Sequence, residues 1–326
     1  MPETLEKPEA RMSDAIAQRV MSSEELERGV VGSIAFSIAP DALAVWNAIE
    51  RLDLFRHIAE LEVKGYTIIP PEKIGPPEFI VRMRETVLDV VERRRGARPD
   101  IEAGTFPVPS ERLNEAFNAV GINVAYLLFE DPVFQEAAAN ETVLAIIDYL
   151  IGKSANITTC LSLIKGPGDI DLPLHIDSVI TPAPLSSHQQ FCNVTWALTD
   201  YSLEEGALCF VPGSHKYLRA PVPGEGIPDR VAVEAPAGSV IIWPGSTWHG
   251  AFARQAPGLR VNMITQYIRP HLRPLEPYRE NVTPQILAAN PPRFATLMGQ
   301  DLNHGWKAEG PQRESTAYNR GRHAYD

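Results

Sequence analysis

The second half of the chain carries eight short runs rich in β-branched and aromatic residues, separated by proline and glycine. These runs are residues 156–164, 174–180, 191–198, 207–211, 231–234, 239–243, 249–254 and 259–268. Short strands with turn residues between them are typical of a jelly roll or double-stranded β-helix. Helical patterns come earlier in the chain. The sequence therefore predicts a mainly β, cupin-like fold wrapped by N-terminal helices.

The first half of the chain alternates helical patterns with short strands. Residues 41–64 keep helical spacing of apolar residues, with Asp41 as the predicted cap, and another helix follows Pro76 and Pro77. Further strands are predicted at 65–69 and 123–129, and further helices at 132–140 and 141–151. We expect a tail (1–40), a helical support region (41–152), the double-stranded β-helix core (153–270) and a C-terminal extension (271–326) with short helices near 284–289 and 292–298.

Composition and charge argue against several classes of partner. The chain has 326 residues, 44% of them hydrophobic and 22% charged, which is ordinary for a globular protein. Its net charge of −11 argues against nucleic acid and anionic membranes as partners. The chain shows no secretory signal, and its apolar runs fall short of the ~20 residues that span a bilayer. Cys160, Cys192 and Cys209 lack zinc-site spacing and predict buried free thiols in a cytoplasmic protein.

The segment LPLHID at 172–177 places an imidazole and a carboxylate two residues apart. Alternate residues of an extended strand point to the same face, so His175 and Asp177 are expected side by side. Such a pair with one more histidine forms the facial triad of non-haem Fe(II) oxygenases. His249, in GSTWHGAF at 245–252, is the candidate third ligand. An isolated H-x-D tripeptide is common, and its histidine is more often a core or surface residue than a ligand.

Arg260 follows His249 by eleven residues (260 − 249), across the predicted turn 255–258. In a hairpin closed by that turn, the pairs are Arg254 with Leu259, Ala253 with Arg260, and Ala251 with Asn262. Arg260 then lies on the face of His249, about 13 Å along the strand. Arginine binds carboxylates in a bidentate manner, so this spacing predicts a site for a small dicarboxylate such as 2-oxoglutarate.

Four blocks of the sequence resemble the phytanoyl-CoA dioxygenase family of Fe(II)/2-oxoglutarate-dependent oxygenases, which have a double-stranded β-helix. The blocks are LPLHID, TWALTDYSLEEGALCFVPGSHK (195–216), APAGSVIIWPGSTWHGAFA (235–253) and GLRVNMITQYIRP (258–270), in the family's order. The resemblance implies that His175, Asp177 and His249 hold iron and that Arg260 binds the distal carboxylate of 2-oxoglutarate. It also implies that Trp196 lies beside the cosubstrate, although packing in the barrel core explains this tryptophan equally well.

The resemblance implies a dioxygenase that uses O₂ to convert 2-oxoglutarate to succinate and CO₂ while it oxidises a substrate. Halogenating relatives lack the carboxylate ligand, so Asp177 favours hydroxylation or a related oxidation. Two alternatives stay open. One is a non-catalytic cupin-like binding protein. The other is a cupin-type metalloenzyme that uses another metal without 2-oxoglutarate.

The sequence indicates the substrate less clearly than it indicates the metal site. Loops 97–120, 178–190 and 270–300 are expected to line the pocket, and their apolar residues favour a hydrophobic small molecule. These residues are Phe106, Val108, Val179, Ile180, Leu185 and Leu272. His188 lies in one of these loops, whereas His215 in PGSHK is interpreted as a turn residue. The arginine run 93–95 allows a coenzyme A clamp, but basic residues before a glycine equally suit a helix C-terminus.

Overall fold

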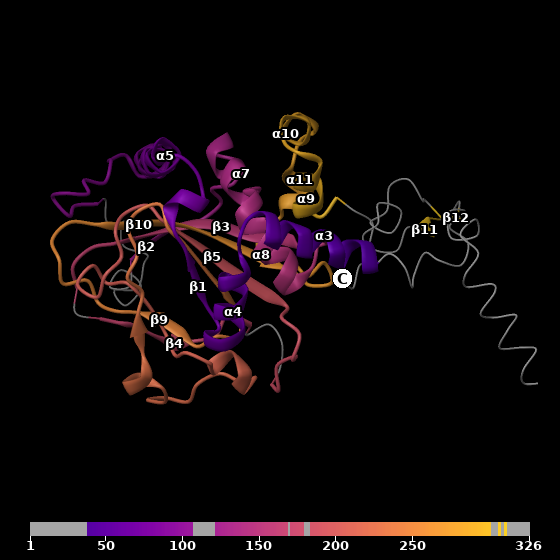
Figure 1. The fold of residues 1–326 in the computed structure, drawn as a ribbon. Coiled ribbons are helices and arrows are strands. Elements are labelled where there is room, and N and C mark those ends of the chain that lie inside the picture. Colours follow the sequence, from indigo (N-terminus) through magenta and orange to yellow (C-terminus); the bar gives the residue numbers. More distant parts are fainter. Residues whose placement is uncertain are drawn as a thin grey trace, which may run out of the picture. The chain divides into compact units, whose positions relative to one another are not determined.

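Two β-sheets form the frame of the computed structural model, which describes residues 38–106, 121–168, 170–178 and 183–300 and two short strands near the C-terminus (Figure 1). Both sheets belong to one compact unit, Val45–Gln300. The other unit comprises Met1–Ala44 and Asp301–Asp326, and its strands β11 (Trp306–Lys307) and β12 (Gly310–Pro311) pair with each other. The predicted tail, residues 1–40, lies almost entirely outside the described residues.

The larger sheet has the strand order β1-β8-β5-β10-β3-β2, and the smaller sheet has the order β4-β9-β6-β7. The strands of the larger sheet are β1 (Thr67–Ile69), β2 (Ile122–Val124), β3 (Asn156–Lys165), β5 (Phe191–Ala197), β8 (Val240–Pro244) and β10 (Arg260–Ile268). Those of the smaller sheet are β4 (Leu172–His175), β6 (Leu208–Phe210), β7 (Val231–Ala232) and β9 (His249–Ala251). All neighbouring strands are antiparallel. The predicted double-stranded β-helix is confirmed, and each of the eight predicted runs overlaps one of the strands β3 to β10.

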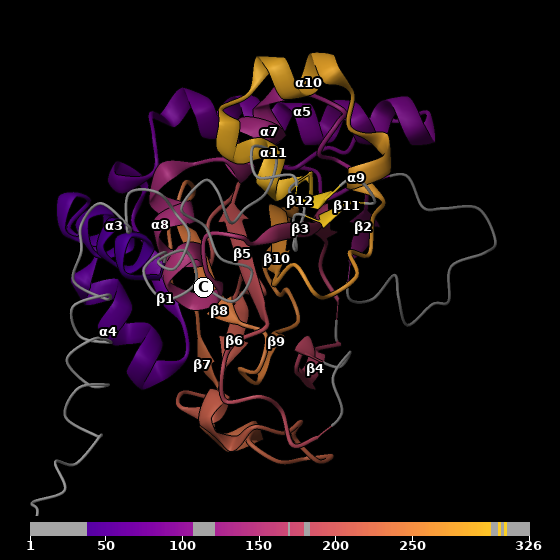
Figure 2. The same ribbon diagram turned by 90° about the vertical axis from the view of Figure 1, so that its right-hand side faces the viewer.

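Helices cover the outer face of the larger sheet, and Figures 1 and 2 show α5, α7 and α11 on that side. The α-helices of the described chain are α3 (Ile38–Arg51), α4 (Phe55–Lys64), α5 (Pro77–Arg95), α7 (Pro132–Ala138), α8 (Glu141–Ile151), α9 (Tyr278–Asn281), α10 (Pro284–Ala289) and α11 (Pro292–Leu297). The inner face of this sheet meets the smaller sheet. Across that space Trp243 of β8 lies edge-on to Phe210 of β6, with ring centroids 5.2 Å apart. The unit Val45–Gln300 is therefore layered as helices, larger sheet and smaller sheet.

The single helix predicted over residues 41–64 is wrong, because the structure has two helices there, α3 and α4. The chain breaks at Asp53, whose φ of 52° ends the first helix. Aspartate adopts this left-handed conformation more readily than most residues. The break buries Leu54 completely at the start of α4. Asp41 lies inside α3 instead of capping it.

Helix α5 begins after Pro76, as predicted, and ends at Gly96, whose φ is 80°. The three arginines of its last turn bind protein groups. Arg93 and Arg94 each lie 2.7 Å from a carboxylate oxygen of Glu130. Arg94 and Arg95 also donate to backbone carbonyls of residues 123–126. These contacts fasten α5 to the segment after β2 and support the interpretation of the run as a helix end.

The C-terminal extension is fixed to β3 through the buried carboxylate of Glu276. One oxygen accepts hydrogen bonds from the Thr159 hydroxyl at 2.6 Å and the Tyr126 backbone N–H at 3.1 Å. The other oxygen accepts from the Cys160 backbone N–H and the Tyr278 hydroxyl. Helices α10 and α11 match the two predicted helices and pack on the helix-covered side (Figure 2).

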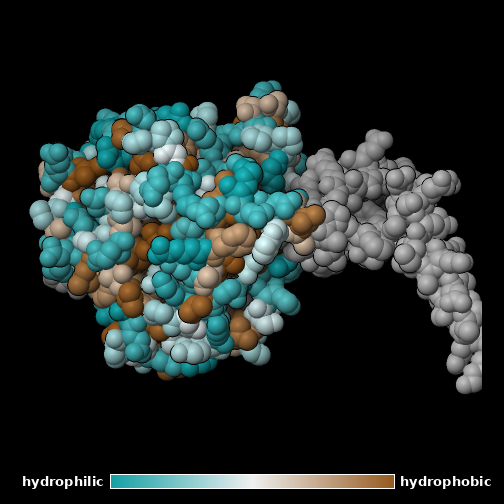
Figure 3. Space-filling model, viewed as in Figure 1, coloured by the Kyte–Doolittle hydropathy of each residue, from teal (hydrophilic) through white to brown (hydrophobic). Residues whose placement is uncertain are grey.

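The surface of the described chain is mixed in polarity. In Figure 3 hydrophobic side chains lie in small groups among hydrophilic ones. Within the described helices, none combines the length and apolar character that crossing a bilayer requires. All three cysteines are buried and free, as predicted.

Candidate metal centre

His175, Asp177 and His249 converge where β4 meets β9. His175 is the last residue of β4 and pairs with His249, the first residue of β9. Because β4 ends at His175, Asp177 reaches the site through a turn and not on the predicted continuous strand. Its backbone N–H donates to the Gly245 carbonyl at 2.9 Å, which fixes this turn.

The ligand atoms of the three residues are spaced for a single ion. Asp177 Oδ2 lies 3.3 Å from His249 Nε2, and Asp177 Oδ1 lies 3.7 Å from His175 Nε2. Within this triad all three potential ligand atoms lie within 4.8 Å of one another. Two ligand atoms held at right angles, each about 2.1 Å from a metal, are about 3 Å apart. The donor set and its spacing therefore fit one transition-metal ion.

Backbone carbonyls and one amide orient these side chains. His175 Nδ1 lies 2.8 Å from the Pro173 carbonyl, and His249 Nδ1 lies 3.0 Å from the Thr247 carbonyl. A proton donated from Nδ1 leaves the Nε2 lone pair free for a metal, the arrangement usual for histidine ligands. Asn193 of β5 donates its amide N–H to Asp177 Oδ2 at 2.8 Å. The metal-facing atoms are thus preorganised.

Burial and mutual contact set the charges of the triad. Burial acts to raise the pKa of Asp177, but the neighbouring imidazoles and the Asn193 amide outweigh it and lower that pKa. Burial acts to lower the pKa of His249, whereas the Asp177 carboxylate raises it overall. Burial and the adjacent His249 lower the pKa of His175. The site therefore contains a carboxylate and favours a neutral His175, which are the forms that bind metals.

Arg260 is buried in β10, but the predicted hairpin around it is wrong. The turn 255–258 joins the smaller sheet to the larger one, so β9 and β10 do not pair with each other. Arg260 pairs with Lys165 of β3 instead of Ala253. The other two predicted pairs also fail, because Ala251 pairs with Leu172 and Leu208, Asn262 pairs with Ala197, and Arg254 and Leu259 lie outside the strands.

The guanidinium of Arg260 nevertheless reaches the segment just before β6. It donates to the Gly206 carbonyl, four residues before Phe210, and Phe210 pairs with His249. The guanidinium lies 4.8 Å from the centroid of the Tyr201 ring, and its buried Nε has no hydrogen-bond partner among the described residues. An orphaned buried donor of this kind suits an anionic ligand group.

Trp196 does not join the site. Side chains alternate along a strand, and Asn193 of the same strand faces Asp177. Trp196, three residues further, therefore faces the helices, where its ring lies edge-on to Phe79 of α5 with centroids 5.9 Å apart. The structure corrects the expectation of a cosubstrate contact and supports the alternative of core packing.

A half-buried apolar strip lies on the inner face of β3 and β10. Leu161 and Leu163 of β3 are partly exposed, and Leu161 pairs with Ile264 of β10. Two residues beyond Ile264, Gln266 donates to the Asn193 side-chain oxygen at 2.8 Å. Because Asn193 holds Asp177, this strip adjoins the metal centre. The sequence reasoning missed Asn193, Gln266 and Lys165, whose only signal is their strand register.

The predicted pocket loops contribute less than expected within the described residues. Residues 107–120 and 179–182, which include Val108, Val179 and Ile180, lie outside that part of the chain. Phe106 packs against the main core, and Leu185 packs beside Ile176 and Trp248.

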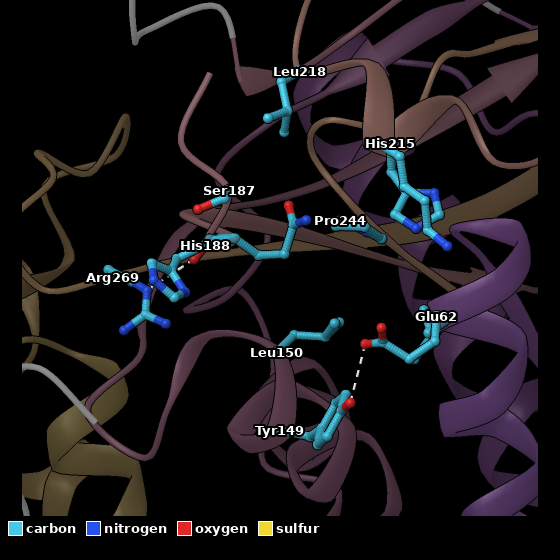
Figure 4. Close-up of a pocket in the computed structure, with 12 residues that line it drawn as sticks. Glu62, Tyr149, Leu150, Ser187, His188, His215, Leu218, Pro244 and Arg269 are labelled. Carbon is cyan, nitrogen blue, oxygen red and sulfur yellow. Dashed lines mark hydrogen bonds between the residues drawn. The ribbon is translucent and has the colours of Figure 1, made fainter. Parts of the chain in front are cut away.

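A separate surface cavity of about 530 Å³ opens beside α4 and α8 (Figure 4). Exposed His188 and largely buried His215 line it, and none of the three triad residues does. On its opposite wall the Tyr149 hydroxyl donates to Glu62 at 3.0 Å. His215 lies in the short 3₁₀ helix Ser214–Tyr217, consistent with its interpretation as a turn residue.

The protein therefore combines a double-stranded β-helix with a cluster of two histidines and one carboxylate. The chain belongs to the phytanoyl-CoA dioxygenase (PhyH) family, whose sequence profile matches residues 61–262. The matched segment contains the triad and Arg260. A dioxygenase of Aspergillus fumigatus, af480, is 28% identical over 197 residues, 59% of this chain. The chain spans 63% of that relative's length.

Solved structures show the same fold. HygX of Streptomyces hygroscopicus, crystallised with nickel and 2-oxoglutarate, superposes with a TM-score of 0.51 and 18% identity, over 66% of this chain and 86% of HygX. SnoN, a non-haem α-ketoglutarate-dependent epimerase of nogalamycin biosynthesis, gives a TM-score of 0.52 and 22% identity, over 72% of this chain and 90% of SnoN. At these identities the likeness concerns the fold alone.

Proposed function

We propose that this protein is an Fe(II)- and 2-oxoglutarate-dependent dioxygenase that oxidises an apolar small molecule. The observation that carries the proposal is the convergence of two Nε2 atoms and one carboxylate in a barrel that also buries a guanidinium with an unused donor. Family membership and the 2-oxoglutarate bound in HygX support it. Bound iron supplies O₂ activation coupled to the conversion of 2-oxoglutarate to succinate and CO₂.

The residues of the chain hold and orient these groups. His175, Asp177 and His249 are the proposed iron ligands, and Asn193 keeps the carboxylate of Asp177 in place. Arg260 is the proposed partner of the distal carboxylate of 2-oxoglutarate, since guanidinium and carboxylate form two parallel hydrogen bonds. Retention of Asp177 as a ligand favours hydroxylation or a related oxidation.

The substrate class follows from the strip beside the metal centre. Leu161 and Leu163 present half-buried apolar side chains there, Ile264 is buried beside them, and Gln266 is the polar group at the edge of the strip. Apolar walls with few polar groups are typical of small-molecule pockets. We therefore propose a largely apolar substrate that approaches from the β3 and β10 side.

The test measures metal binding and turnover together. Wild-type protein is titrated anaerobically with Fe(II) and 2-oxoglutarate, then exposed to O₂ with a library of apolar metabolites while succinate is quantified. We expect His175→Ala, Asp177→Ala and His249→Ala to lose more Fe(II) affinity than the roughly 10–100-fold typical of outer-shell changes, and to release no succinate. His188→Ala, which removes an exposed histidine outside the triad, is the matched control and should behave as wild type.

Two outcomes contradict the proposal. Tight binding of another metal with no response to 2-oxoglutarate indicates a different cupin-type metalloenzyme. Binding of iron and 2-oxoglutarate with no succinate release from any substrate indicates a non-catalytic binding protein.

A further inference from the structure

Lys165, the last residue of β3, lies opposite Arg260 in the register of the larger sheet. Paired residues of antiparallel strands share a face, so both side chains enter the space between the sheets. Only 1% of Lys165 and 2% of Arg260 is exposed. Lys165 Nζ donates to the carbonyl of Phe252, the residue after β9, as Arg260 does to the Gly206 carbonyl. Two buried cations thus project into one end of the barrel.

The charges around this pair do not balance. Among the described residues no carboxylate oxygen lies within 4 Å of either cation, although fifteen lysine or arginine ion pairs are found elsewhere in the same part of the chain. Asp171 is close enough to influence Lys165, but its carboxylate is bound to Arg230 at 2.7 Å. Buried charges are costly unless they are paired. The missing partner for two adjacent cations is an anion.

We propose that Lys165 is a second binding residue for the distal carboxylate of 2-oxoglutarate, acting beside Arg260. The inference rests on the proposed function. An ammonium has three donors, and Lys165 uses one of them on Phe252. Arg260 retains its unpartnered Nε. One carboxylate placed between the two side chains accepts from both and offsets the charge that the protein leaves unpaired.

The site makes cosubstrate binding depend on pH in a defined direction. Burial and the charge of Arg260 lower the pKa of Lys165 to about 8, against the opposing influence of Asp171 and Cys209. A bound carboxylate favours the charged ammonium and raises that pKa again. Above pH 8, binding therefore requires proton uptake, and affinity falls as pH rises. Below pH 7, Lys165 is already charged and adds no pH dependence. The Cys209 thiol, with its pKa raised to about 11 by burial, stays neutral over this range.

The experiment is calorimetric titration of 2-oxoglutarate into protein loaded with Ni(II), which avoids turnover, in buffers of different ionisation enthalpy between pH 6.5 and 9. We expect the wild type to take up roughly one proton per 2-oxoglutarate near pH 9 and almost none at pH 6.5. Lys165→Met should bind 2-oxoglutarate about 10- to 100-fold more weakly at pH 7, which is the usual effect of losing a hydrogen bond to a charged group. It should also lose the proton uptake.

Matched variants distinguish a loss of 2-oxoglutarate binding from a loss of protein stability. Lys165→Arg keeps the charge and should recover most of the affinity without proton uptake, since arginine does not titrate here. Lys216→Met removes an exposed lysine and should leave both quantities unchanged. Equal affinity and proton uptake in wild type and Lys165→Met overturn the inference and leave the proposed function standing. Absence of 2-oxoglutarate binding by the metal-loaded wild type overturns both.

Discussion

The two faces of strand β5 are equally buried, yet they bury different chemistry. Its outer face presents Val194 and Trp196 to the helices. Its inner face presents Asn193 and Thr195 to the space between the sheets, and Asn193 donates to the Asp177 carboxylate of the candidate metal centre. Burial alone therefore does not locate the site in this fold. The feature that locates the site is the presence of polar side chains on a buried face, where apolar side chains are usual.

Truncation of the outer face should give the largest change in stability. Trp196→Ala removes a fully buried indole that packs on Phe79, so we expect a loss of about 3–5 kcal/mol in the free energy of unfolding. Urea denaturation measures it. Trp196→Phe should cost less, because phenylalanine leaves a smaller cavity and the indole Nε1 has no hydrogen-bond partner among the described residues to lose. A folded Trp196→Ala protein with weakened 2-oxoglutarate binding would contradict the assignment of this residue to the core.

Truncation of the inner face should instead act on the metal. Asn193→Ala leaves Asp177 without its amide donor, so we expect Fe(II) affinity to fall about 10–100-fold. Thr195→Val is the matched control on the same face, since the Thr195 hydroxyl has no hydrogen-bond partner among the described groups. Anaerobic titration with Fe(II) compares the two. Equal losses of Fe(II) affinity in both variants would show that the inner face stabilises the fold and does not orient Asp177.

The sequence was sufficient for the fold class and the triad because both have local signals. Strand length and turn residues predicted β3 to β10, and the H-x-D spacing singled out His175 and Asp177. His249 was selected because a turn and Arg260 follow it at a suitable spacing, and the structure brings it to them.

The wrong predictions concern features that depend on residues far apart in the sequence. Apolar and polar residues alternate in β5, but both of its faces are buried, so the pattern did not reveal that the apolar face, with Trp196, meets the helices. The turn 255–258 has hairpin chemistry, but its two strands belong to different sheets. Lys165 has the pattern of a solvated residue at a strand end, and only its register with Arg260 reveals a buried cation.

The smallest effect is expected at the outer edge of the helix layer, and it tests the idea of a coenzyme A clamp. Arg94→Ala removes a partly exposed ion pair with Glu130 and hydrogen bonds to two carbonyls. Exposed pairs contribute little, so the free energy of unfolding should fall by about 1 kcal/mol or less. Because all three arginines already have protein partners, coenzyme A should shift the melting temperatures of wild type and Arg94→Ala equally. A shift confined to the wild type would restore this arginine run as a phosphate-binding site.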